Sequence, residues 1–397
     1  MNVLMISDVY FPRINGVSTS LETFRPALDA QGVRSTLIAP DYPGAGADPA
    51  ANLLRIASRR VPFDPEDRMM RRVPIRAALP RLRDEHFDLV HVHTPFVAHY
   101  AGLEIARALG VPCVATYHTF FEEYLFHYVP VVPRAWLRAL ARHYSRGQCN
   151  ALDAVIVPSR AMAAALERYG VTRPLHVLPT GIPPDKFHGG ESCYFRQRYG
   201  IGKERKVLLF VGRVAHEKNI GFLIDMVERV RRNDPSALLL ITGEGPALPT
   251  LRAHAERRGL GEHVRFLGYL DRHSELHDCY RAADVFVFAS RTETQGLVLL
   301  EAMALGTPVV ALAEMGTRDI LEPQRGCRIA PDDIAGFARV VGDLLADPAA
   351  LRNLGEQARD YARSWGADEM ARRLARVYRR CVDSALEPAN ARRVATP

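Results

Sequence analysis

Residues 206–213 read Lys-Val-Leu-Leu-Phe-Val-Gly-Arg, a short apolar run that ends at a glycine and a cation. A continuous apolar run of this length is typical of a strand in a parallel sheet, which is covered on both faces. Further apolar runs follow it, at 238–242, 264–267, 285–288 and 308–312. Helical stretches separate these runs, and the alternation predicts a parallel sheet with helices on both faces.

The first half of the chain shows the same pattern, with apolar runs at 3–7, 33–39, 89–92, 111–116 and 154–157. At 397 residues the chain is too long for a single compact core. We therefore predict an α/β protein of two doubly wound domains, joined in the Pro/Gly-rich stretch 179–184. The expected domains are 1–183, with a C-terminal helical segment (367–397) packing back on it, and 184–366.

Composition and the lack of targeting signals indicate a folded globular protein without a disulfide framework or a membrane span. Hydrophobic residues make up 48% and charged residues 24% of the chain, which is ordinary for a folded globular protein. The six cysteines form no C-x-x-C pair, so neither a disulfide framework nor a zinc ribbon is expected, and a reducing cytoplasm fits. The N-terminus lacks a signal-peptide pattern, and no apolar run approaches the roughly 18 residues of a membrane span. We expect a cytoplasmic protein that associates peripherally with the inner face of the cell membrane.

Two doubly wound domains that face each other form a central cleft at the carboxyl ends of their strands, where ligands of such sheets bind. The G-x-G-x-x-G pattern is missing after the first strand of either domain, which argues against a dinucleotide enzyme, and the sequence has no P-loop. Arg213 and Lys218 follow the 206–211 strand instead. Held together, these cations can neutralise a diphosphate leaving group, although two solvated surface charges are an equal alternative.

The segment 290–310 gives the strongest indication of a nucleotide ligand. Thr292 or Thr294 is expected to cap a helix in this segment. The first N–H groups of the helix would face a phosphate, and Gly296 would let the backbone approach it. Glu301 falls inside an apolar helix and therefore needs a partner, which is either a ribose diol or a core salt bridge.

Several motifs, in order along the chain, resemble those of glycosyltransferase family four. Glu293-x7-Glu301, followed by Gly-Thr-Pro-Val-Val at 306–310, is similar to the acidic signature of that family. The other similar segments are Gly212-Arg213 with Glu217-Lys218-Asn219, Gly243-Glu-Gly-Pro246, Asn15-Gly16 and Pro179-Thr-Gly-Ile182. Because they span nearly the whole chain, their combination is far more specific than any one of them.

The resemblance implies a GT-B fold of two Rossmann-like domains, with the sugar donor bound mainly by the second. It also implies a retaining enzyme that uses a nucleotide sugar as co-substrate and requires no metal or other cofactor. Carried over to this chain, Arg213 and Lys218 would bind the diphosphate, Glu293 the transferred sugar and Glu301 the ribose. The implied donor site also includes Gly16, Gly243 and the backbone N–H groups at Gly296, Leu297 and Val298.

The chain departs from the family pattern at two places. Asn15 and Asn219 stand where the family usually has glycine. Neither change removes a charged group, so both are expected to be minor.

Histidines end two of the apolar runs of the first domain. His118 matches a family histidine that contacts the donor sugar, so the resemblance places it with Glu293, Arg213 and Lys218 among the catalytic residues. His91 and His93 share one face of a strand, as a metal pair would. Because no third ligand lies at useful spacing, we favour a structural role for these two and expect no metal site.

The acceptor is suggested by two basic zones of the first domain that carry apolar side chains. The stretch 55–83 is rich in arginine, and arginines at 134, 138, 142 and 146 repeat at four-residue steps, as on one helix stripe. Such surfaces lie on anionic lipid headgroups, although a solvated helix face is an equal alternative. The candidate acceptor and membrane residues are Glu122, Tyr124, Arg68, Arg71, Arg72, Arg134, Arg138 and Arg142.

Two segments, 117–124 and 292–296, resemble the branch of the family that contains diacylglycerol glucosyltransferases. This narrower resemblance implies transfer of glucose from UDP-glucose to a diacylglycerol-type membrane lipid. Mannosyl transfer to phosphatidylinositol and transfer to a lipopolysaccharide core stay open. So do a nucleotide-sugar epimerase on the same fold and a module that only binds nucleotide or membrane. No nucleic acid partner is expected.

Overall fold

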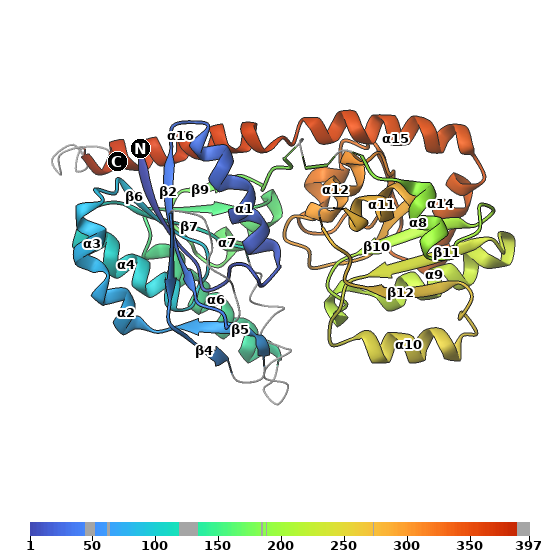
Figure 1. Cartoon of the computed structure of the whole chain (residues 1–397), viewed down its shortest axis with the longest axis horizontal. Coiled ribbons are helices and arrows are strands. Elements are labelled where there is room, and N and C mark those ends of the chain that lie inside the picture. The colour runs from blue at the N-terminus through green and yellow to red at the C-terminus, as the bar shows by residue number, and fades with distance from the viewer. Residues whose placement is uncertain are drawn as a thin grey trace. The chain divides into compact units, whose positions relative to one another are not determined.

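The computed structural model describes residues 1–43, 52–61, 64–118, 134–183, 186–187, 189–272 and 274–386, apart from the side chains of 64–67 and 134–135. The chain forms two compact units: unit 1 is Met1–Gly181 with Ala367–Pro397, and unit 2 is Ile182–Gly366. Each unit has its own sheet and its own helices (Figure 1). The division falls in the Pro/Gly-rich stretch where we expected the domains to join.

Unit 1 is built on a seven-stranded sheet of order β3-β2-β1-β6-β7-β8-β9, in which all neighbours are parallel. Its strands are β1 (Asn2–Ile6), β2 (Arg34–Pro40), β3 (Leu53–Ile56), β6 (Leu89–Val92), β7 (Cys113–Thr116), β8 (Ala154–Val157) and β9 (Leu175–Val177). The central strands are almost fully buried, which accounts for their continuous apolar sequence.

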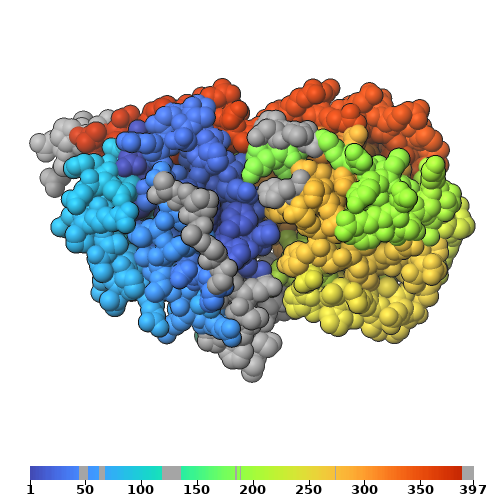
Figure 2. All heavy atoms as spheres, in the orientation of Figure 1, coloured from blue at the N-terminus to red at the C-terminus, as the bar shows by residue number. Residues whose placement is uncertain are grey.

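Helices cover both faces of this sheet. On one face α1 (Gly16–Asp29) and α16 (Ala367–Leu386) lie side by side and enclose one core with the strands (Figure 1). Figure 2 shows α16, in red, exposed along the edge of unit 1. On the other face α4 (Val97–Leu109) packs closely, since a side chain at Gly102 would meet Val92 and Ile6. The remaining helices are α2 (Arg72–Ala77), α3 (Leu79–Asp84), α6 (Arg134–Asn150) and α7 (Arg160–Arg168).

A two-stranded antiparallel hairpin in unit 1 was not predicted. It consists of β4 (Ser58–Val61) and β5 (Asp64–Met70) and pairs Arg60 with Arg68. Its sequence is rich in charge and has no apolar run, so the pattern that marks buried strands does not mark these two.

Unit 2 is built on a six-stranded parallel sheet of order β12-β11-β10-β13-β14-β15. The strands are β10 (Lys206–Val211), β11 (Ala237–Thr242), β12 (Val264–Gly268), β13 (Val285–Phe288), β14 (Val309–Ala311) and β15 (Cys327–Ile329). The helices are α8 (Ser192–Arg198), α9 (Ile220–Asn233), α10 (Leu248–Arg257), α11 (Glu275–Ala282), α12 (Leu297–Ala304), α13 (Thr317–Leu321), α14 (Ile334–Leu345) and α15 (Pro348–Arg363), with a 3-10 turn η1 (His216–Lys218).

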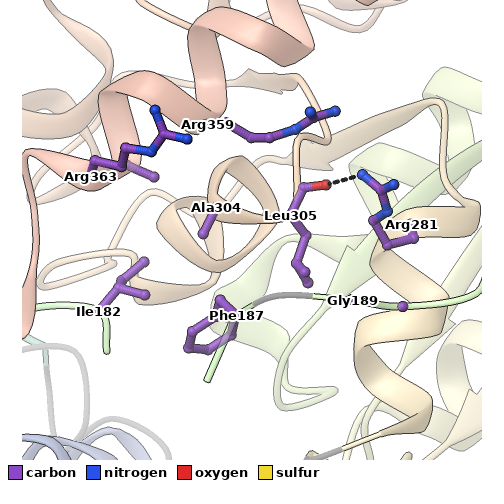
Figure 3. Close-up of a pocket in the computed structure, with 10 residues that line it drawn as sticks. Ile182, Phe187, Gly189, Arg281, Ala304, Leu305, Arg359 and Arg363 are labelled. Carbon is purple, nitrogen blue, oxygen red and sulfur yellow. Dashed lines mark hydrogen bonds between the residues drawn. The ribbon is translucent and has the colours of Figure 1, made fainter. Parts of the chain in front are cut away.

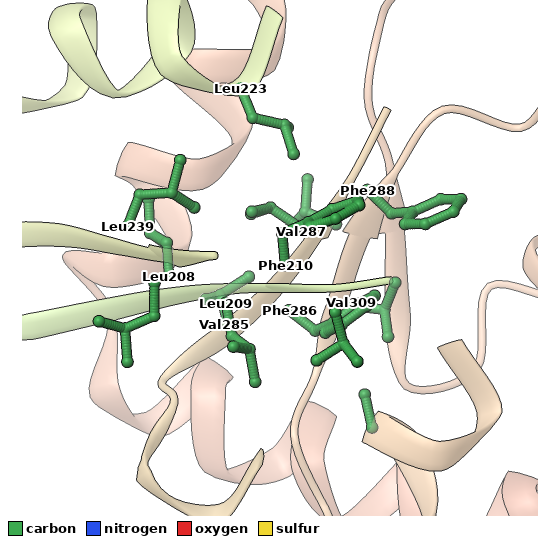
Figure 4. Packing of buried hydrophobic residues seen from close by; sticks show 14 of the residues in the cluster. Leu208, Leu209, Phe210, Leu223, Leu239, Val285, Phe286, Val287, Phe288 and Val309 are labelled. Atoms are coloured by element: carbon green, nitrogen blue, oxygen red, sulfur yellow. The ribbon is translucent and has the colours of Figure 1, made fainter. Parts of the chain in front are cut away.

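The core of unit 2 centres on the two strands that meet in the middle of the sheet. Phe210 of β10 and Phe288 of β13 stack with ring centroids 5.8 Å apart, and Phe286 stacks on Phe288 at 6.2 Å (Figure 4). All three side chains are buried. Their packing fixes β10 against β13, and therefore fixes the loops that follow these strands.

The strand order of each sheet reverses at one point. Strands β1 to β3 run toward one edge of the first sheet and β6 returns to the other side of β1, while β13 returns to the other side of β10 in the second sheet. The loops after the two flanking strands diverge at such a switch point and leave a crevice where ligands of doubly wound folds bind. Between β10 and β13, these loops carry Arg213, Lys218 and Glu293.

Candidate functional site

Two opposite charges meet at the switch point of unit 2. Lys218 Nζ donates a hydrogen bond of 2.6 Å to Glu293 Oε2. Only 21% and 18% of the two side chains are exposed. The structure therefore brings together a cation after β10 and a carboxylate after β13, two residues that sequence resemblance placed in one donor site.

Burial opposes the ionisation of Glu293, but its partners outweigh burial. The charge and the hydrogen bond of Lys218, together with the backbone N–H groups of Gln295 and Gly296, hold the pKa of Glu293 below its ordinary value. The carboxylate is therefore ionised at neutral pH. Its unused lone pairs can accept hydrogen bonds from sugar hydroxyls.

The turn that carries Lys218 is held in place by Asn219. This residue has a left-handed backbone with φ of 55°, a conformation that asparagine tolerates better than most residues and that glycine adopts freely. Its side-chain N–H donates to the carbonyl of Ala289, just after β13, at 3.1 Å. Asparagine can replace the family glycine here because it accepts the same backbone conformation and adds a bond across the switch point.

Arg213, the second candidate phosphate ligand, is exposed on the loop after β10. Among the described residues its side chain has no hydrogen-bond or ion-pair partner. It is therefore a cation that the fold leaves available, whereas Lys218 is already paired.

Gly243 serves the packing of two loops. It has φ of 119°, and a side chain there would collide with the carbonyl oxygen of Gly212. The close approach is held by backbone bonds from Gly212 N–H to Thr242 O (3.1 Å) and from Gly243 N–H to Gly268 O (2.8 Å). The close approach of the two loops therefore requires a glycine at position 243 whether or not a donor binds there. The contact of Gly243 with the donor stays a prediction.

The start of α12 differs from our expectation. Neither Thr292 nor Thr294 caps the helix; the N-cap is Gly296, with φ of 94°. This left-handed conformation suits glycine and would strain a threonine. Because glycine offers no side-chain cap, the first-turn N–H groups of Leu297 and Val298 have no side-chain acceptor from the cap and are well placed for an anion.

Glu301 lies inside α12 and is 5% exposed. Arg272 Nη2 donates to its Oε1 at 3.0 Å, and the Tyr280 hydroxyl donates to its Oε2 at 3.0 Å. The core salt bridge that we weighed against a ribose partner is therefore present, so burial of Glu301 alone does not require a ligand. Each oxygen keeps a further lone pair, and the implied ribose contact stays a prediction.

In unit 1, His118 belongs to a chain of neutral polar groups. His118 Nε2 lies 3.4 Å from His93 Nδ1, and the His93 ring lies against the ring of His91 with centroids 3.9 Å apart. His91 in turn bonds Tyr378 of α16 through Nδ1 (2.6 Å) and Thr116 through Nε2 (2.8 Å). The C-terminal helix thus reaches His118 through two buried imidazoles, and the structural role we favoured for His91 and His93 agrees with these contacts.

Burial keeps these imidazoles uncharged. It lowers the pKa of His91 to about 3, helped by the charge of His118, and lowers the pKa of His118 to about 4. Burial and the two neighbouring histidines lower the pKa of His93 further. His93 Nε2 has no hydrogen-bond partner among the described residues, and the cavity of about 30 Å³ beside it has room for water.

The switch point of unit 1 holds a carboxylate that sequence reasoning missed. Asp8 follows β1, accepts a hydrogen bond from the Thr94 hydroxyl at 2.8 Å and accepts the N–H of Ala98 at the start of α4. Burial raises the pKa of Asp8 to about 6, against these hydrogen bonds. An Asp directly after the first strand was the available signal.

Asn15, where the family usually has glycine, caps the start of α1. Its Oδ1 accepts the N–H groups of Val17 and Ser18, both at 3.0 Å, and the Ser18 hydroxyl accepts the Asn15 N–H in a capping box. These N–H groups would otherwise be open to an anion. Gly16 beside them is exposed, with open space where a side chain would lie, and its implied phosphate contact stays a prediction.

The predicted basic zones lie on unit 1. Arg71 and Arg72 are exposed at the start of α2, and Arg72 lies over the ring of Tyr100 at 5.3 Å. Arg68 is half-buried and donates to Ser58 across the hairpin at 3.1 Å. Arg138 and Arg142 are exposed on α6; Arg134 begins this helix, but its side chain lies outside the described residues, as do Glu122 and Tyr124 altogether.

Large apolar side chains are also exposed on α2, α4 and α6. Trp136 and Leu140, one turn apart on α6, are 74% and 59% exposed. Val73 of α2 is 76% exposed, and Tyr100 of α4 is 42% exposed. We call Arg71, Arg72, Val73, Tyr100, Trp136, Arg138, Leu140 and Arg142 the basic–apolar surface. Side chains of this kind gather where a protein meets a lipid surface or a partner.

Sequence comparison identifies the family. The model described as "Glycosyltransferase Family 4" matches residues 14–186, and "Glycosyl transferases group 1" matches residues 194–361. An alpha-monoglucosyldiacylglycerol synthase of Streptococcus pneumoniae is 33% identical over 318 residues, which cover 78% of this chain and 71% of that protein. The chain belongs to glycosyltransferase family four. It is therefore a glycosyltransferase, which sets aside the epimerase and the purely binding module.

Two further comparisons give one more relative of this family four glycosyltransferase and a solved structure with a similar fold. A GDP-mannose-dependent alpha-(1-6)-phosphatidylinositol monomannoside mannosyltransferase of Mycolicibacterium smegmatis is 30% identical over 374 residues, 91% of this chain and 93% of that protein. The crystal structure of Anabaena HepE in complex with UDP-glucose matches with a TM-score of 0.75 at 18% identity, over 95% of this chain and 99% of that chain. The fold is GT-B, as predicted.

Several groups of the glycosyltransferase carried no signal in the sequence. Arg272 and Tyr280 reach Glu301 from other elements, and Tyr378 reaches His91 across 287 residues. No cluster of three or more His, Cys, Asp or Glu side chains suited to a metal ion occurs in the part of the chain that the structure describes. No described helix is both long and apolar enough to cross a bilayer.

Proposed function

We propose that this enzyme transfers a hexose, glucose from UDP-glucose, to a membrane lipid of the diacylglycerol type, with retention of anomeric configuration. The donor half rests on one observation, the Lys218–Glu293 pair at the switch point of unit 2. The acceptor half rests on the basic–apolar surface and on relatives named for lipid substrates.

The diphosphate of the donor binds between the loops after β10 and β13. Lys218 has three N–H donors and uses one in its bond to Glu293, so it can donate to the carboxylate and to a phosphate at the same time. Arg213 adds an available guanidinium, and the N–H groups of Leu297 and Val298 add fixed partial charges. These groups stabilise the negative charge that grows on the leaving diphosphate.

The sugar is held by neutral or anionic groups. Glu293, ionised and oriented by Lys218, accepts hydrogen bonds from sugar hydroxyls, and Glu301 accepts the ribose hydroxyls. His118, as the family resemblance implies, contacts the transferred sugar as an uncharged imidazole, so it does not repel positive charge on the sugar ring. The acceptor hydroxyl attacks from the face that the diphosphate leaves and gives its proton to the leaving oxygen, so no side chain need act as base.

The basic–apolar surface brings the enzyme to its lipid. Arg71, Arg72, Arg138 and Arg142 face anionic headgroups, and Trp136 and Leu140 enter the apolar boundary of the bilayer. The enzyme is accordingly peripheral.

Mannosyl transfer from GDP-mannose to a phosphatidylinositol lipid is a second candidate. It is favoured by the mannosyltransferase of Mycolicibacterium smegmatis, which the chain matches at 30% identity over 93% of that protein.

A panel assay separates the two candidates. Radiolabelled UDP-glucose, UDP-galactose and GDP-mannose are each incubated with vesicles containing diacylglycerol or phosphatidylinositol, and labelled lipid is extracted. We expect α-glucosyl diacylglycerol from UDP-glucose. Labelled phosphatidylinositol mannoside alone would establish the second candidate, and the absence of labelled lipid under every condition would sink the lipid-acceptor proposal.

The membrane contact is tested with vesicles. Co-sedimentation with phosphatidylglycerol vesicles should fall with salt, and Arg138→Ala with Arg142→Ala should weaken it by about 1 kcal/mol for each arginine. The control pair, Arg257→Ala with Arg352→Ala, removes two exposed arginines of unit 2. Equal loss in both pairs, or equal binding to phosphatidylcholine vesicles, would contradict the assignment of this surface.

A further inference from the structure

A cavity of about 420 Å³ opens on unit 2 away from the donor loops (Figure 3). Arg281 lies in the last turn of α11, which leads into the amino end of β13, and Leu305 lies between α12 and the amino end of β14. The donor loops follow the carboxyl ends of β10 and β13. The cavity therefore lies at the amino ends of the strands, opposite the donor loops. Helix α12 begins at the donor segment and ends at the cavity.

Three arginines line this cavity: Arg281, Arg359 and Arg363. Two of them are positioned by the backbone around them. Arg281 donates to the Leu305 carbonyl at 3.0 Å, and its stem lies against Gly190, where a Cβ would come within 2.6 Å of the Arg281 Cγ. The guanidinium of Arg359 lies against Gly306, where a side chain would displace it. Both arginines thus occupy surfaces that only glycine leaves open.

Within the described part of the lining, the arginine charges have no counter-charge. No Asp or Glu is among the described lining residues, and Arg281 and Arg359 form no ion pair with any described residue. Arg363 bonds Asp360 at 2.8 Å, but both of these side chains are largely exposed. All three arginines are exposed, so water screens their mutual repulsion, and each guanidinium remains able to donate to a bound anion.

The rest of the lining is apolar. Ile182, Phe187, Ala304, Leu305 and Ala362 form it, and the Phe187 ring is held against His277 with centroids 5.3 Å apart. Figure 3 shows the three arginines along one side of the cavity and Ile182 and Phe187 along the other. A ligand that fills the cavity therefore needs an anionic group on one side and an apolar group on the other.

We propose that this cavity binds an organic phosphate, with the phosphate held by Arg281 and Arg359 and the apolar part of the ligand lying on Phe187 and Ile182. Guanidinium groups bind phosphate oxygens bidentately, and Arg281 is already held by its bond to the Leu305 carbonyl. The proposal concerns neither the donor nor the basic–apolar surface, and it does not depend on either. The same chemistry occurs in a phosphoglycerolipid and in a soluble phosphate ester.

The test is calorimetric titration of the full-length enzyme with three monomeric probes: inorganic phosphate, glycerol 3-phosphate and dihexanoyl phosphatidate. Binding should weaken about tenfold or more in Arg281→Glu and in Arg359→Glu, since each loses a charged hydrogen bond and gains a like charge. Arg352→Glu, an exposed arginine earlier on α15 that does not line the cavity, is the matched control. Arg213→Ala controls for binding at the donor loops.

We expect Arg352→Glu to bind like wild type, and Arg213→Ala to keep the binding that Arg281→Glu and Arg359→Glu lose. Tighter binding of dihexanoyl phosphatidate than of glycerol 3-phosphate assigns the cavity to a lipid phosphate, and equal binding assigns it to a soluble ester. The proposal is overturned if none of the three probes binds wild type. It is also overturned if Arg352→Glu loses as much affinity as Arg359→Glu, or if Arg213→Ala alone abolishes binding. Two independent charge reversals guard against one variant that does not fold.

Discussion

The switch points of the two units have the same topology and opposite chemistry. In unit 2, β10 and β13 present Lys218 and Glu293 as a close ion pair, with Arg213 exposed nearby. In unit 1, β1 and β6 present Asp8, bonded to a threonine hydroxyl and to the start of α4, beside imidazoles that burial keeps neutral.

The difference suits the two tasks that we propose for the units. A leaving diphosphate needs positive charge, and unit 2 offers a lysine whose burial is offset by a carboxylate. A sugar has hydroxyls and no charge, and the histidines of unit 1 offer hydrogen bonds without charge.

Lys218→Ala should have the largest effect, because it removes charge where the diphosphate leaves. We expect kcat to fall about 10² to 10³-fold, the usual cost of losing one preorganised donor to a developing anion. Steady-state transfer measures this. Lys203→Ala, an exposed lysine before β10, should leave kcat unchanged. A similar loss in Lys203→Ala would show that general charge, and not the switch point, matters.

Tyr378→Phe should have the next largest effect and should act on unit 1. It leaves His91 Nδ1 without its 2.6 Å partner in a fully buried site, which costs about 1–3 kcal/mol of the free energy of unfolding. Chemical denaturation measures the cost. If the histidine chain positions His118, kcat should also fall while KM changes little, and the exposed Tyr194→Phe of unit 2 should change neither. If stability falls but kcat stays at the wild-type value, the row of contacting side chains from Tyr378 to His118 has only a structural role.

Mild acid should weaken unit 1 before unit 2. The pKa of His91 is about 3 in the folded protein against an ordinary 6.5, so the unfolded chain takes up the proton first. The stabilising contribution is complete above pH 6.5 and is lost as pH falls, by about 1.4 kcal/mol for each pH unit. His93, His99 and His118 act in the same sense. Asp8, with its pKa raised to about 6, acts in the opposite sense and offsets part of the loss.

Glu293 of unit 2 is different, because its pKa lies below 4.5 and its contribution is lost only below that pH. Hydrogen exchange at pH 5 and pH 7, corrected for intrinsic rates, should therefore show faster opening at the lower pH in peptides of unit 1 only. Equally faster exchange in both units at pH 5 would contradict the proposed difference in their response to acid.

Asn15→Gly should have the smallest effect. Exchanging an asparagine N-cap for glycine costs only a few tenths of a kcal/mol, and Asn15→Asp keeps the cap as a control. If unit 2 supplies the charge for the diphosphate, the affinity for the nucleotide sugar should stay within about twofold in calorimetry. A clear gain in affinity for Asn15→Gly would mean that the freed N–H groups of α1 bind phosphate.

The strands at the two switch points were predictable because buried parallel strands have continuous apolar sequences. Leu89–Val92 and Val285–Phe288 have the predicted ends. The hairpin Ser58–Val61 with Asp64–Met70 was not predictable in this way, because its pairing is antiparallel and its residues are charged.

The site was predictable in its residue types and less so in its contacts. Lys218 and Glu293 meet because β13 returns beside β10, a feature of topology that the family resemblance carries. The sequence indicated that Glu301 needs a partner but could not name Arg272 and Tyr280, because they lie on other elements whose distance from Glu301 the sequence does not encode. Asn15 shows that an uncharged substitution can take up the N–H groups at a helix start.

The central claim is that the loops of unit 2 hold the donor diphosphate, and Arg213 tests it most directly because it has no partner among the described residues whose loss would disturb the fold. UDP, GDP and their parent nucleosides are titrated into wild type and Arg213→Ala. We expect the preferred diphosphate to bind Arg213→Ala about tenfold or more weakly than wild type, and the nucleoside to bind both proteins equally. Equal affinity of both proteins for the diphosphate would contradict it.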